Sequence, residues 1–242
     1  MKILAIDTSN QVMSVALMDE ARLIVERIIN VKRNHSIQLM PAIEAIMKEA
    51  DWKPKELTRI VVAKGPGSYT GVRIGVTVAK SLAFSLNIEL VGVSSLEVLA
   101  ANGAQIPDSY CVPIFDARRG NIYTGLYQYK EHRLVQIEKD THIAAEQWGL
   151  YLKRLKGPIQ LLGEDRLIHT ELFENNCGDN LIELPASLHY PHASVLAERG
   201  SYLEPENVHL FEPEYLKLAE AEQNWMEAHP DFEKGDGWIE KL

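Results

Sequence analysis

The stretch Gly65-Pro66-Gly67-Ser68-Tyr69-Thr70-Gly71 connects a short β-rich run, residues 59–63, to a helical pattern that continues to about residue 86. Its glycines permit a tight turn, and either Ser68 or Thr70 can cap the start of the helix. Backbone N–H groups that are free at a helix start can hold an anion, so the loop is a candidate phosphate site. A capped turn that packs on a neighbouring surface explains the same residues equally well. The loop is neither a Walker loop, because no Lys-Ser or Lys-Thr pair follows its last glycine, nor a dinucleotide fingerprint, whose glycines are spaced differently.

The sequence on either side of this loop predicts a mixed sheet. Three short apolar runs with little sequence between them indicate an antiparallel meander, at residues 3–6, 12–18 and 23–29. From Ser36 to Ala50 apolar residues recur on one side of a helix, with Ser36 as its N-cap and Pro41 either kinking it or marking its true start. A strand at residues 89–93 and a helix from Ser95 follow the loop and its helix. The order β-β-β-α-β-α-β-α is typical of an α/β mixed sheet with crossover helices.

A second unit with a similar plan begins after Pro107. Three more strands with a turn at 116–120 form another predicted meander, at residues 110–115, 121–129 and 132–138. Weaker patterns predict helices near 144–156 and 192–202, a strand at 159–162, and an Ala- and Glu-rich helix in the tail, 215–242. We therefore predict two lobes, residues 1–106 and residues 107–242.

Composition and charge limit the possible classes of protein. The chain has 242 residues, of which 46% are hydrophobic, and this ordinary globular composition excludes wholesale disorder. Lys and Arg number 25 and Asp and Glu 34, so the net charge is −9, which argues against autonomous nucleic-acid binding but not against contact with RNA inside a complex. We expect no membrane segment, no signal peptide in the short apolar start, and a cytoplasmic location, because Cys111 and Cys177 form no CxxC motif.

Two polar turns are candidates for ligand contact. Asp7-Thr8-Ser9 ends the first apolar run and can meet a phosphate or a metal, although a strand-terminating turn that needs no ligand is favoured for the triplet alone. The hairpin tip at 116–120 carries the guanidinium groups of Arg118 and Arg119, which can contact a phosphate, but a solvated turn with Gly120 at positive φ is favoured there. The eight histidines form no ligand set, and neither HExxH nor GxSxG occurs. No catalytic and no metal-binding residue is predicted.

The helix after the glycine loop has an unusual surface. Gly75, Ala79 and Ala83 recur every four residues and form a shallow stripe that another backbone can approach. Apolar residues reach round nearly the whole helix, which implies burial on two sides, one against its own sheet and one against either a partner helix or a second layer of the same domain. Phe84 among polar neighbours favours the partner, and Trp at residue 79 or 83 is then expected to break the complex and leave the fold intact. The predicted interface consists of Ile37, Met40, Ile43, Met47, Arg73, Ile74, Gly75, Thr77, Val78, Ala79, Lys80, Leu82, Ala83 and Phe84.

Five segments together resemble one bacterial family. They are ILAIDTS (3–9), GPGSYTGVRIG (65–75), GVSSLEVLA (92–100), FDARRGNIYTGLY (115–127) and PEYLKLAEAEQNW (213–225), and they resemble the TsaB (YeaZ) family. That family is similar to the actin-like (ASKHA) superfamily of two-lobed, ribonuclease-H-like α/β folds. The resemblance implies work with a paralogue, TsaD, and with TsaE and TsaC, in the threonylcarbamoyl modification of the adenosine beside the tRNA anticodon.

Departures from the paralogue's pattern imply the role. TsaD is expected to carry a His-x-x-x-His metal motif where this chain has Ser95 and Leu99, neither of which replaces an imidazole ligand. No Gly-Gly pair is present to match the superfamily's adenosine-binding glycines, and the hairpin at 116–120 replaces a glycine-rich phosphate hairpin. The resemblance therefore implies a degenerate, non-catalytic paralogue that binds no cofactor alone, with ATP and a metal on TsaD.

The expected mechanism is binding and activation of TsaD, with contact to TsaE and only indirect contact with the TsaC product and tRNA. Because the two folds are paralogous, the same surface is expected to form a homodimer when TsaD is absent. Residues that could still contact a nucleotide or phosphate are Asp7, Thr8, Ser9, Gly65, Gly67, Ser68, Thr70 and Arg118. The alternatives are a residual ATPase or peptidase that acts on TsaD and an independent RNA-binding module, which the net charge disfavours.

Overall fold

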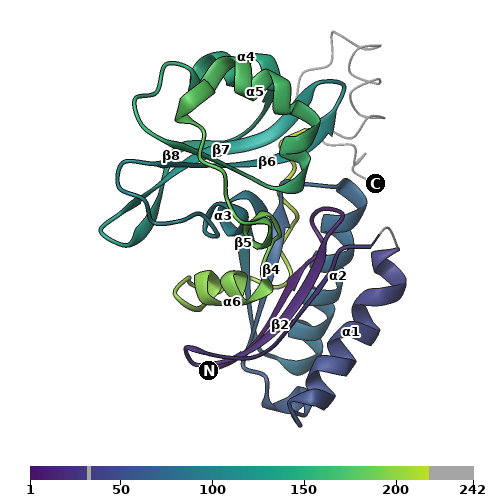
Figure 1. Cartoon of the computed structure of the whole chain (residues 1–242). Helices are drawn as coiled ribbons and strands as arrows, with labels where there is room; N and C mark the ends of the chain where they lie inside the picture. Colours follow the sequence, from purple (N-terminus) through teal and green to yellow (C-terminus); the bar gives the residue numbers. More distant parts are fainter. Residues whose placement is uncertain (32–33, 218–242) are drawn as a thin grey trace, which may run out of the picture.

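Two lobes, each built on a mixed β-sheet, make up the computed structural model, which describes residues 1–31 and 34–217 (Figure 1). The elements of the first lobe are β1 (Lys2–Asp7), β2 (Met13–Asp19), β3 (Arg22–Ile29), α1 (His35–Glu49), the 3-10 turn η1 (Pro54–Glu56), β4 (Arg59–Gly65), α2 (Tyr69–Leu86) and β5 (Glu89–Ser94). The strand order is β3-β2-β1-β4-β5, in which β1 is antiparallel to β2 and parallel to β4. The predicted meander and crossover helices are confirmed.

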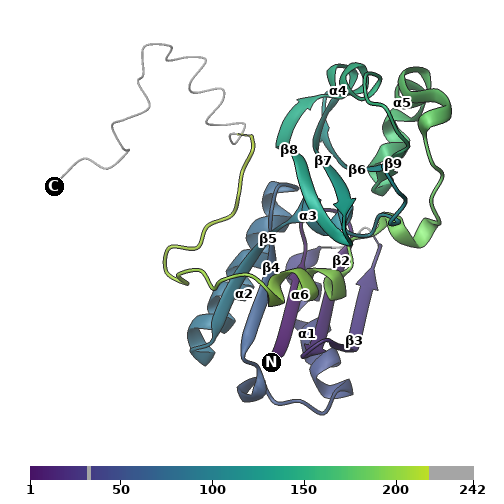
Figure 2. The same ribbon diagram turned by 90° about the vertical axis from the view of Figure 1, so that its left-hand side faces the viewer.

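The second lobe repeats this plan with shorter helices. The elements that follow β5 in the chain are α3 (Ser95–Ala100), β6 (Tyr110–Arg118), β7 (Asn121–Lys130), β8 (Arg133–Ala144), α4 (Ala145–Leu152), β9 (Ile159–Leu162), η2 (Glu164–His169), α5 (Thr170–Cys177), η3 (Gly178–Asn180), η4 (Ala186–His189) and α6 (Ala193–Ser201). Side chains of α3 pack against both sheets. The strand order is β8-β7-β6-β9, in which only the β6–β9 pair is parallel. Figure 2 shows α4 and α5 gathered at one side of this sheet. The sequence gives no prediction of α5, because only Phe173 and Cys177 of that helix are buried and they set up no clear periodicity.

Alternating side chains of the first sheet build two separate cores. On β1, Leu4 and Ile6 face α1 and α2, whereas Ile3 and Ala5 face α6 on the other side of the sheet. Both faces of the strand are apolar because both are covered, which is the arrangement expected of the inner strands of a parallel sheet. The continuous apolar run at the start of the sequence is therefore explained by a sheet that lies between two layers of helix.

The last described helix, α6, belongs to the first sheet by its contacts. Ala193, Leu196 and Ala197 pack against the apolar face opposite α1 and α2, although the predicted boundary at residue 107 assigns them to the second lobe. Glu26 on β3 accepts hydrogen bonds from the backbone N–H and the hydroxyl of Ser194, both at 2.8 Å, and thereby caps the start of α6. The chain thus returns to the first lobe after it completes the second.

Several helix starts differ from the prediction. Asn34, and not Ser36, caps α1, because its side chain accepts from the Ser36 N–H. The helix begins six residues before Pro41, which therefore does not mark its true start. Ser68 caps α2 by accepting from the Gly71 N–H, so Thr70 is not the cap. Of the predicted tail helix, residues 215–217 are not helical, and 218–242 lie outside the described residues. No helix in the described part of the chain combines the length and the apolar character of a membrane crossing.

Residues 203–217, which we name the strap, run without regular structure from the end of α6 along α2 to the space between the lobes. The Glu206 N–H donates to the Leu90 carbonyl at 2.8 Å, and the Glu214 N–H donates to the Lys64 carbonyl at 2.7 Å. Between these points the buried ring of Phe211 lies on Gly92, where a Cβ atom would stand only 2.7 Å from the ring. The strap is therefore fixed to the first sheet at three places, two on the edge strand β5 and one at the end of β4.

Candidate functional site

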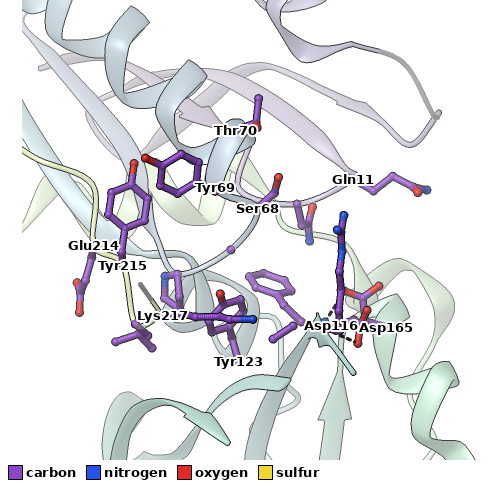
Figure 3. A pocket seen from close by; sticks show the side chains of 17 residues that line it. Gln11, Ser68, Tyr69, Thr70, Asp116, Tyr123, Asp165, Glu214, Tyr215 and Lys217 are labelled. Carbon is purple, nitrogen blue, oxygen red and sulfur yellow. Dashed lines mark hydrogen bonds between the residues drawn. The ribbon is translucent and has the colours of Figure 1, made fainter. Parts of the chain in front are cut away.

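A cleft of about 570 Å³ lies between the lobes, where the start of α2 faces the tip of the β6–β7 hairpin (Figure 3). Three parts of the chain line it. They are Asn10, Gln11 and residues 66–70 of the first lobe, Phe115 to Arg118 with Tyr123 and Asp165 of the second, and Glu214 to Lys217 of the strap. The cleft brings together four of the predicted phosphate contacts, namely Gly67, Ser68, Thr70 and Arg118.

The triplet Asp7-Thr8-Ser9 lies beneath the glycine loop and does not reach the cleft. All three residues are buried; Thr8 donates its hydroxyl hydrogen to the Gly71 carbonyl at 2.7 Å, and the Ser68 N–H donates to the Ser9 carbonyl at 2.7 Å. Gly67 is required for this packing, because a Cβ atom there would collide with the Ser9 carbonyl oxygen. Among the alternatives predicted for the triplet, the structure favours the strand-terminating turn, in which the Ser9 N–H donates to the Asp7 carboxylate at 2.8 Å.

Burial also changes the chemistry of Asp7. Desolvation raises the pKa of its carboxyl group, and the hydrogen bonds from Ser9 and the charge of His35 only partly oppose this effect. Within the described residues its second oxygen has no hydrogen-bond partner. The closed position of this carboxyl group keeps it from contacting a ligand bound in the cleft.

The two positions that correspond to the implied histidines of the paralogue serve the packing of this chain. The Ser95 hydroxyl accepts from the Gly65 N–H at 3.1 Å and so ties the end of β4 to the start of α3. Leu99 is fully buried in the apolar cluster between α3 and the second sheet. Across residues 1–31 and 34–217, no group of three or more His, Cys, Asp or Glu side chains is arranged to hold a metal ion. Gly65 is buried as well, with the Glu214 carbonyl against it, and does not line the cleft.

The charges that line the cleft are mixed. Arg118 and Lys217 are accompanied by the carboxyl groups of Asp116, Asp165 and Glu214. Burial raises the pKa of Asp165, and the neighbouring negative charge of Asp116 adds to the rise, although the Asp116 N–H donates to Asp165 at 2.9 Å. The walls also carry aromatic rings, and in Figure 3 those of Tyr69 and Tyr215 lie side by side, with centroids 4.8 Å apart. This lining suits a small polar molecule with a flat apolar part better than a bare phosphate, which needs clustered cations.

Most residues of the cleft were not predicted as site residues, and Tyr123, Asp165 and Lys217 are examples. Tyr123 lies inside one of the segments on which the resemblance rests. The alternation of side chains along β7 places it on the same face of the strand as residue 121, but it does not reveal what that face contacts. Asp165 and Lys217 reach the cleft from η2 and from the strap. Asp165 lies in a short 3-10 helix with no periodic pattern. Lys217 belongs to a segment used for the resemblance, but nothing in that segment shows that it faces the cleft.

The predicted interface forms the other candidate site, on the outer side of α1 and α2. A groove of about 610 Å³ lies between the two helices, and its lining is mostly apolar, with the charged side chains of Glu44 and Lys48 among it. Ile43 and Met47 line the groove but are themselves buried in the core of the first lobe.

Met40 lies half exposed at the groove, and Ile37 on the same helix is 72% exposed. Phe84 of α2 is 64% exposed and faces the strap, where its ring touches that of His209. Large apolar side chains so exposed on neighbouring helices are typical of a surface that binds another protein.

The small-residue stripe is not part of this surface, and that part of the prediction is wrong. Ala79 and Ala83 are buried against the chain's own sheet. Gly75 faces the same way, with a Cβ position 2.5 Å from the Thr8 hydroxyl oxygen. Trp at residue 79 or 83 would therefore disrupt the fold instead of leaving it intact. The predicted interface residues of α2 that remain open are Arg73, Thr77 and Phe84, which are exposed, and Ile74, Val78, Lys80 and Leu82, which are half-buried.

Comparison with known proteins places this chain beside a well-defined group. A family model described as "TsaD: tRNA N6-adenosine threonylcarbamoyltransferase" matches residues 24–225. The tRNA threonylcarbamoyladenosine biosynthesis protein TsaB of Bacillus subtilis (strain 168) is 48% identical over 228 residues, which are 94% of this chain and 99% of that protein. The TsaB of Escherichia coli (strain K12) is 32% identical over 137 residues, 54% of this chain and 57% of that protein.

Solved structures are similar over most of the chain. YeaZ from Pseudomonas aeruginosa is 25% identical with a TM-score of 0.68, and the match covers 89% of this chain and 99% of that one. A ROK hexokinase from Thermus thermophilus is 14% identical with a TM-score of 0.50, and the match covers 82% and 99% of the two chains. The hexokinase shares the fold alone. The predicted two-lobed actin-like α/β fold is confirmed.

Proposed function

The chain belongs to the TsaB family of tRNA threonylcarbamoyladenosine biosynthesis proteins, and on this basis we propose that it is the non-catalytic subunit that binds and activates the paralogue TsaD. The observation that carries the proposal is the match along almost the whole chain to a TsaB protein, together with a family model described for the transferase itself. A chain that shares its plan with the transferase can present the same helices to it, so that the pair assembles around a pseudo-two-fold axis.

The outer face of α1 and α2 supports this arrangement. It carries an apolar groove with exposed Met40 at its edge, and Ile37 and Phe84 are exposed elsewhere on the same two helices. Burial of such side chains is the main favourable term in association. Without TsaD the same face pairs with a second copy of this chain. TsaE, the TsaC product and tRNA then meet the assembled complex, and this chain reaches the last two only indirectly.

A non-catalytic role agrees with the chemistry of the described residues. Asp7 lies closed beneath the glycine loop, and the two positions expected to hold histidines in TsaD are a serine bonded to the backbone and a leucine in the core. ATP and a metal are therefore assigned to TsaD, and no cofactor to this chain alone. The contribution of this chain is to stabilise the competent arrangement of its partner, a coupling free energy between subunits and not a reacting group.

The test is size-exclusion chromatography with light scattering, on the full chain alone and mixed with TsaD from the same organism. The proposal expects a homodimer that converts to a one-to-one heterodimer, and threonylcarbamoyl transfer to tRNA by TsaD that depends on this chain. A monomer that ignores TsaD contradicts the proposal. Hydrolysis of ATP or cleavage of TsaD by this chain alone would instead support the residual ATPase or peptidase.

A further inference from the structure

The strap runs beside α2 on the side opposite α1. The Lys80 ammonium of α2 donates to the Phe211 carbonyl at 2.6 Å and to the His209 carbonyl at 3.3 Å. One end of α2 meets the strap where the rings of Phe84 and His209 are in edge contact, with centroids 5.4 Å apart. The other end meets it where Tyr69 stacks on Tyr215. The strap therefore accompanies α2 along most of its length, and the exposed face of the helix lies between α1 and the strap.

The middle of the strap is apolar and open. Leu210 is 77% exposed, and it follows His209, which touches the exposed ring of Phe84. The anchors on either side explain why Leu210 cannot turn inward: Phe211 already fills the place on Gly92, and the Leu210 N–H donates to the Asn207 carbonyl in a tight turn. An exposed apolar side chain one residue from the His209–Phe84 contact adds apolar surface to the side of α2 that faces the strap.

We infer that the strap forms the second wall of the surface onto which TsaD docks, so that docking buries His209 and Leu210 together with Phe84. The inference rests on the proposed function, because it takes TsaD as the occupant of the α1–α2 face. Two observations favour this occupant: the strap is continuous with that face through the Phe84–His209 contact, and residues 24–225, which include the strap to its end at 217, match the family model described for the transferase. The partner is thus a paralogue with a comparable face, and helices from it would lie on α2 with α1 on one side and the strap on the other.

A partner docked on the strap would also affect the cleft between the lobes. Glu214 to Lys217 line the cleft and are covalently continuous with His209 and Leu210. A partner that rests on the strap would limit the movement of Tyr215 against Tyr69, and so the shape of the cleft opening. The docking surface and the cleft then share one segment of backbone.

The experiment measures the affinity of the full chain for TsaD by isothermal titration calorimetry, with three variants of comparable chemistry. Leu210→Asp places a charge in the proposed strap wall, Thr77→Arg blocks the exposed face of α2, and Leu167→Asp is the control, because Leu167 is exposed on η2 of the second lobe. We expect Leu210→Asp to weaken binding about tenfold, Thr77→Arg to weaken it by more, and Leu167→Asp to leave it unchanged. Circular dichroism and thermal unfolding check that each variant folds.

The outcomes separate the inference from the function on which it rests. If Thr77→Arg abolishes binding while Leu210→Asp binds as the wild type does, the strap is not a wall and the proposed function stands. If the wild-type chain itself fails to bind TsaD, the proposed function fails. If Leu210→Asp lowers only the homodimerisation of the chain, measured by light scattering, the occupant of the strap is a second copy, and the inference about TsaD is overturned. Protection of strap amides from hydrogen exchange in the TsaD complex, with none in the control region of α4, is a second supporting result.

Discussion

The helix layers of the two lobes follow one plan but end in different surfaces. In the first lobe α1 and α2 have 15 and 18 residues, and they leave an apolar groove and three exposed apolar side chains on their outer side. In the second lobe α4 and α5 have 8 residues each, and Leu150 is the exposed large apolar residue among their described side chains. Packing of the first lobe's core uses the inner sides of α1 and α2 and does not require apolar residues on their outer sides. The difference therefore points to binding as the reason for the outer face of α1 and α2, and it can be tested one face at a time.

The inner face of α2 should be the more sensitive to substitution. Trp in place of Ala79, which is fully buried against β1 and β4, has no space and is expected to lower the free energy of unfolding by about 3 kcal/mol or more. Ser81→Trp, on the exposed side of the same helix, is the matched control and should change it by about 0.5 kcal/mol at most. Urea unfolding followed by circular dichroism measures both. A stable Ala79→Trp variant that loses only TsaD binding would return the small-residue stripe to the interface.

The outer faces of the two lobes should respond in opposite ways. Phe84→Asp is expected to weaken binding to TsaD by about tenfold or more, which corresponds to about 1.4 kcal/mol, because it puts a charge where an exposed ring would be buried. Leu150→Asp makes the same kind of change on α4 and should leave the affinity unaltered. Equal losses in the two variants, measured by calorimetry, would remove the distinction between the lobes.

The fold was largely predictable because its signals are local. The closely spaced apolar runs at 3–6, 12–18 and 23–29 predicted the meander, and the glycine loop at 65–71 between a strand and a helix predicted the crossover of a mixed sheet. The sequence could not show which face of α2 packs on the sheet and which remains open. A stripe such as Gly75, Ala79 and Ala83 suits a partner's backbone and the chain's own sheet equally well. The cleft shows the same limit: Asp7 and Thr70 belong to neighbouring motifs, yet one is closed beneath the loop and the other lines the opening. The strap had no periodic signal at all, because its position depends on single contacts such as Phe211 on Gly92.

The return of α6 to the first sheet gives the smallest predicted effect, and it depends on pH. The hydrogen bond to Glu26 raises the pKa of His192, although burial opposes this rise. Burial alone would raise the pKa of Glu26. The hydrogen bonds from His192 and Ser194 outweigh burial, so the pKa of Glu26 is lowered. The contribution of His192 is complete below its unfolded pKa near 6.5 and is lost as the pH rises through the raised value. The contribution of Glu26 is complete above its unfolded value near 4.5 and is lost as the pH falls through the lowered value.

The pair therefore stabilises the fold most between about pH 4.5 and pH 6.5. His192→Gln should lower the free energy of unfolding by about 0.5 to 1 kcal/mol at pH 5.5, a range that allows for screening by solvent at these half-buried groups, and by less at pH 8. His132→Gln, at an exposed turn of the second lobe, is the control for loss of an imidazole. Thermal unfolding at both pH values gives the comparison. A difference between wild type and His192→Gln that stays constant with pH would mean that α6 is held to β3 by packing and by the Ser194 cap, with no part played by the charge on the imidazole.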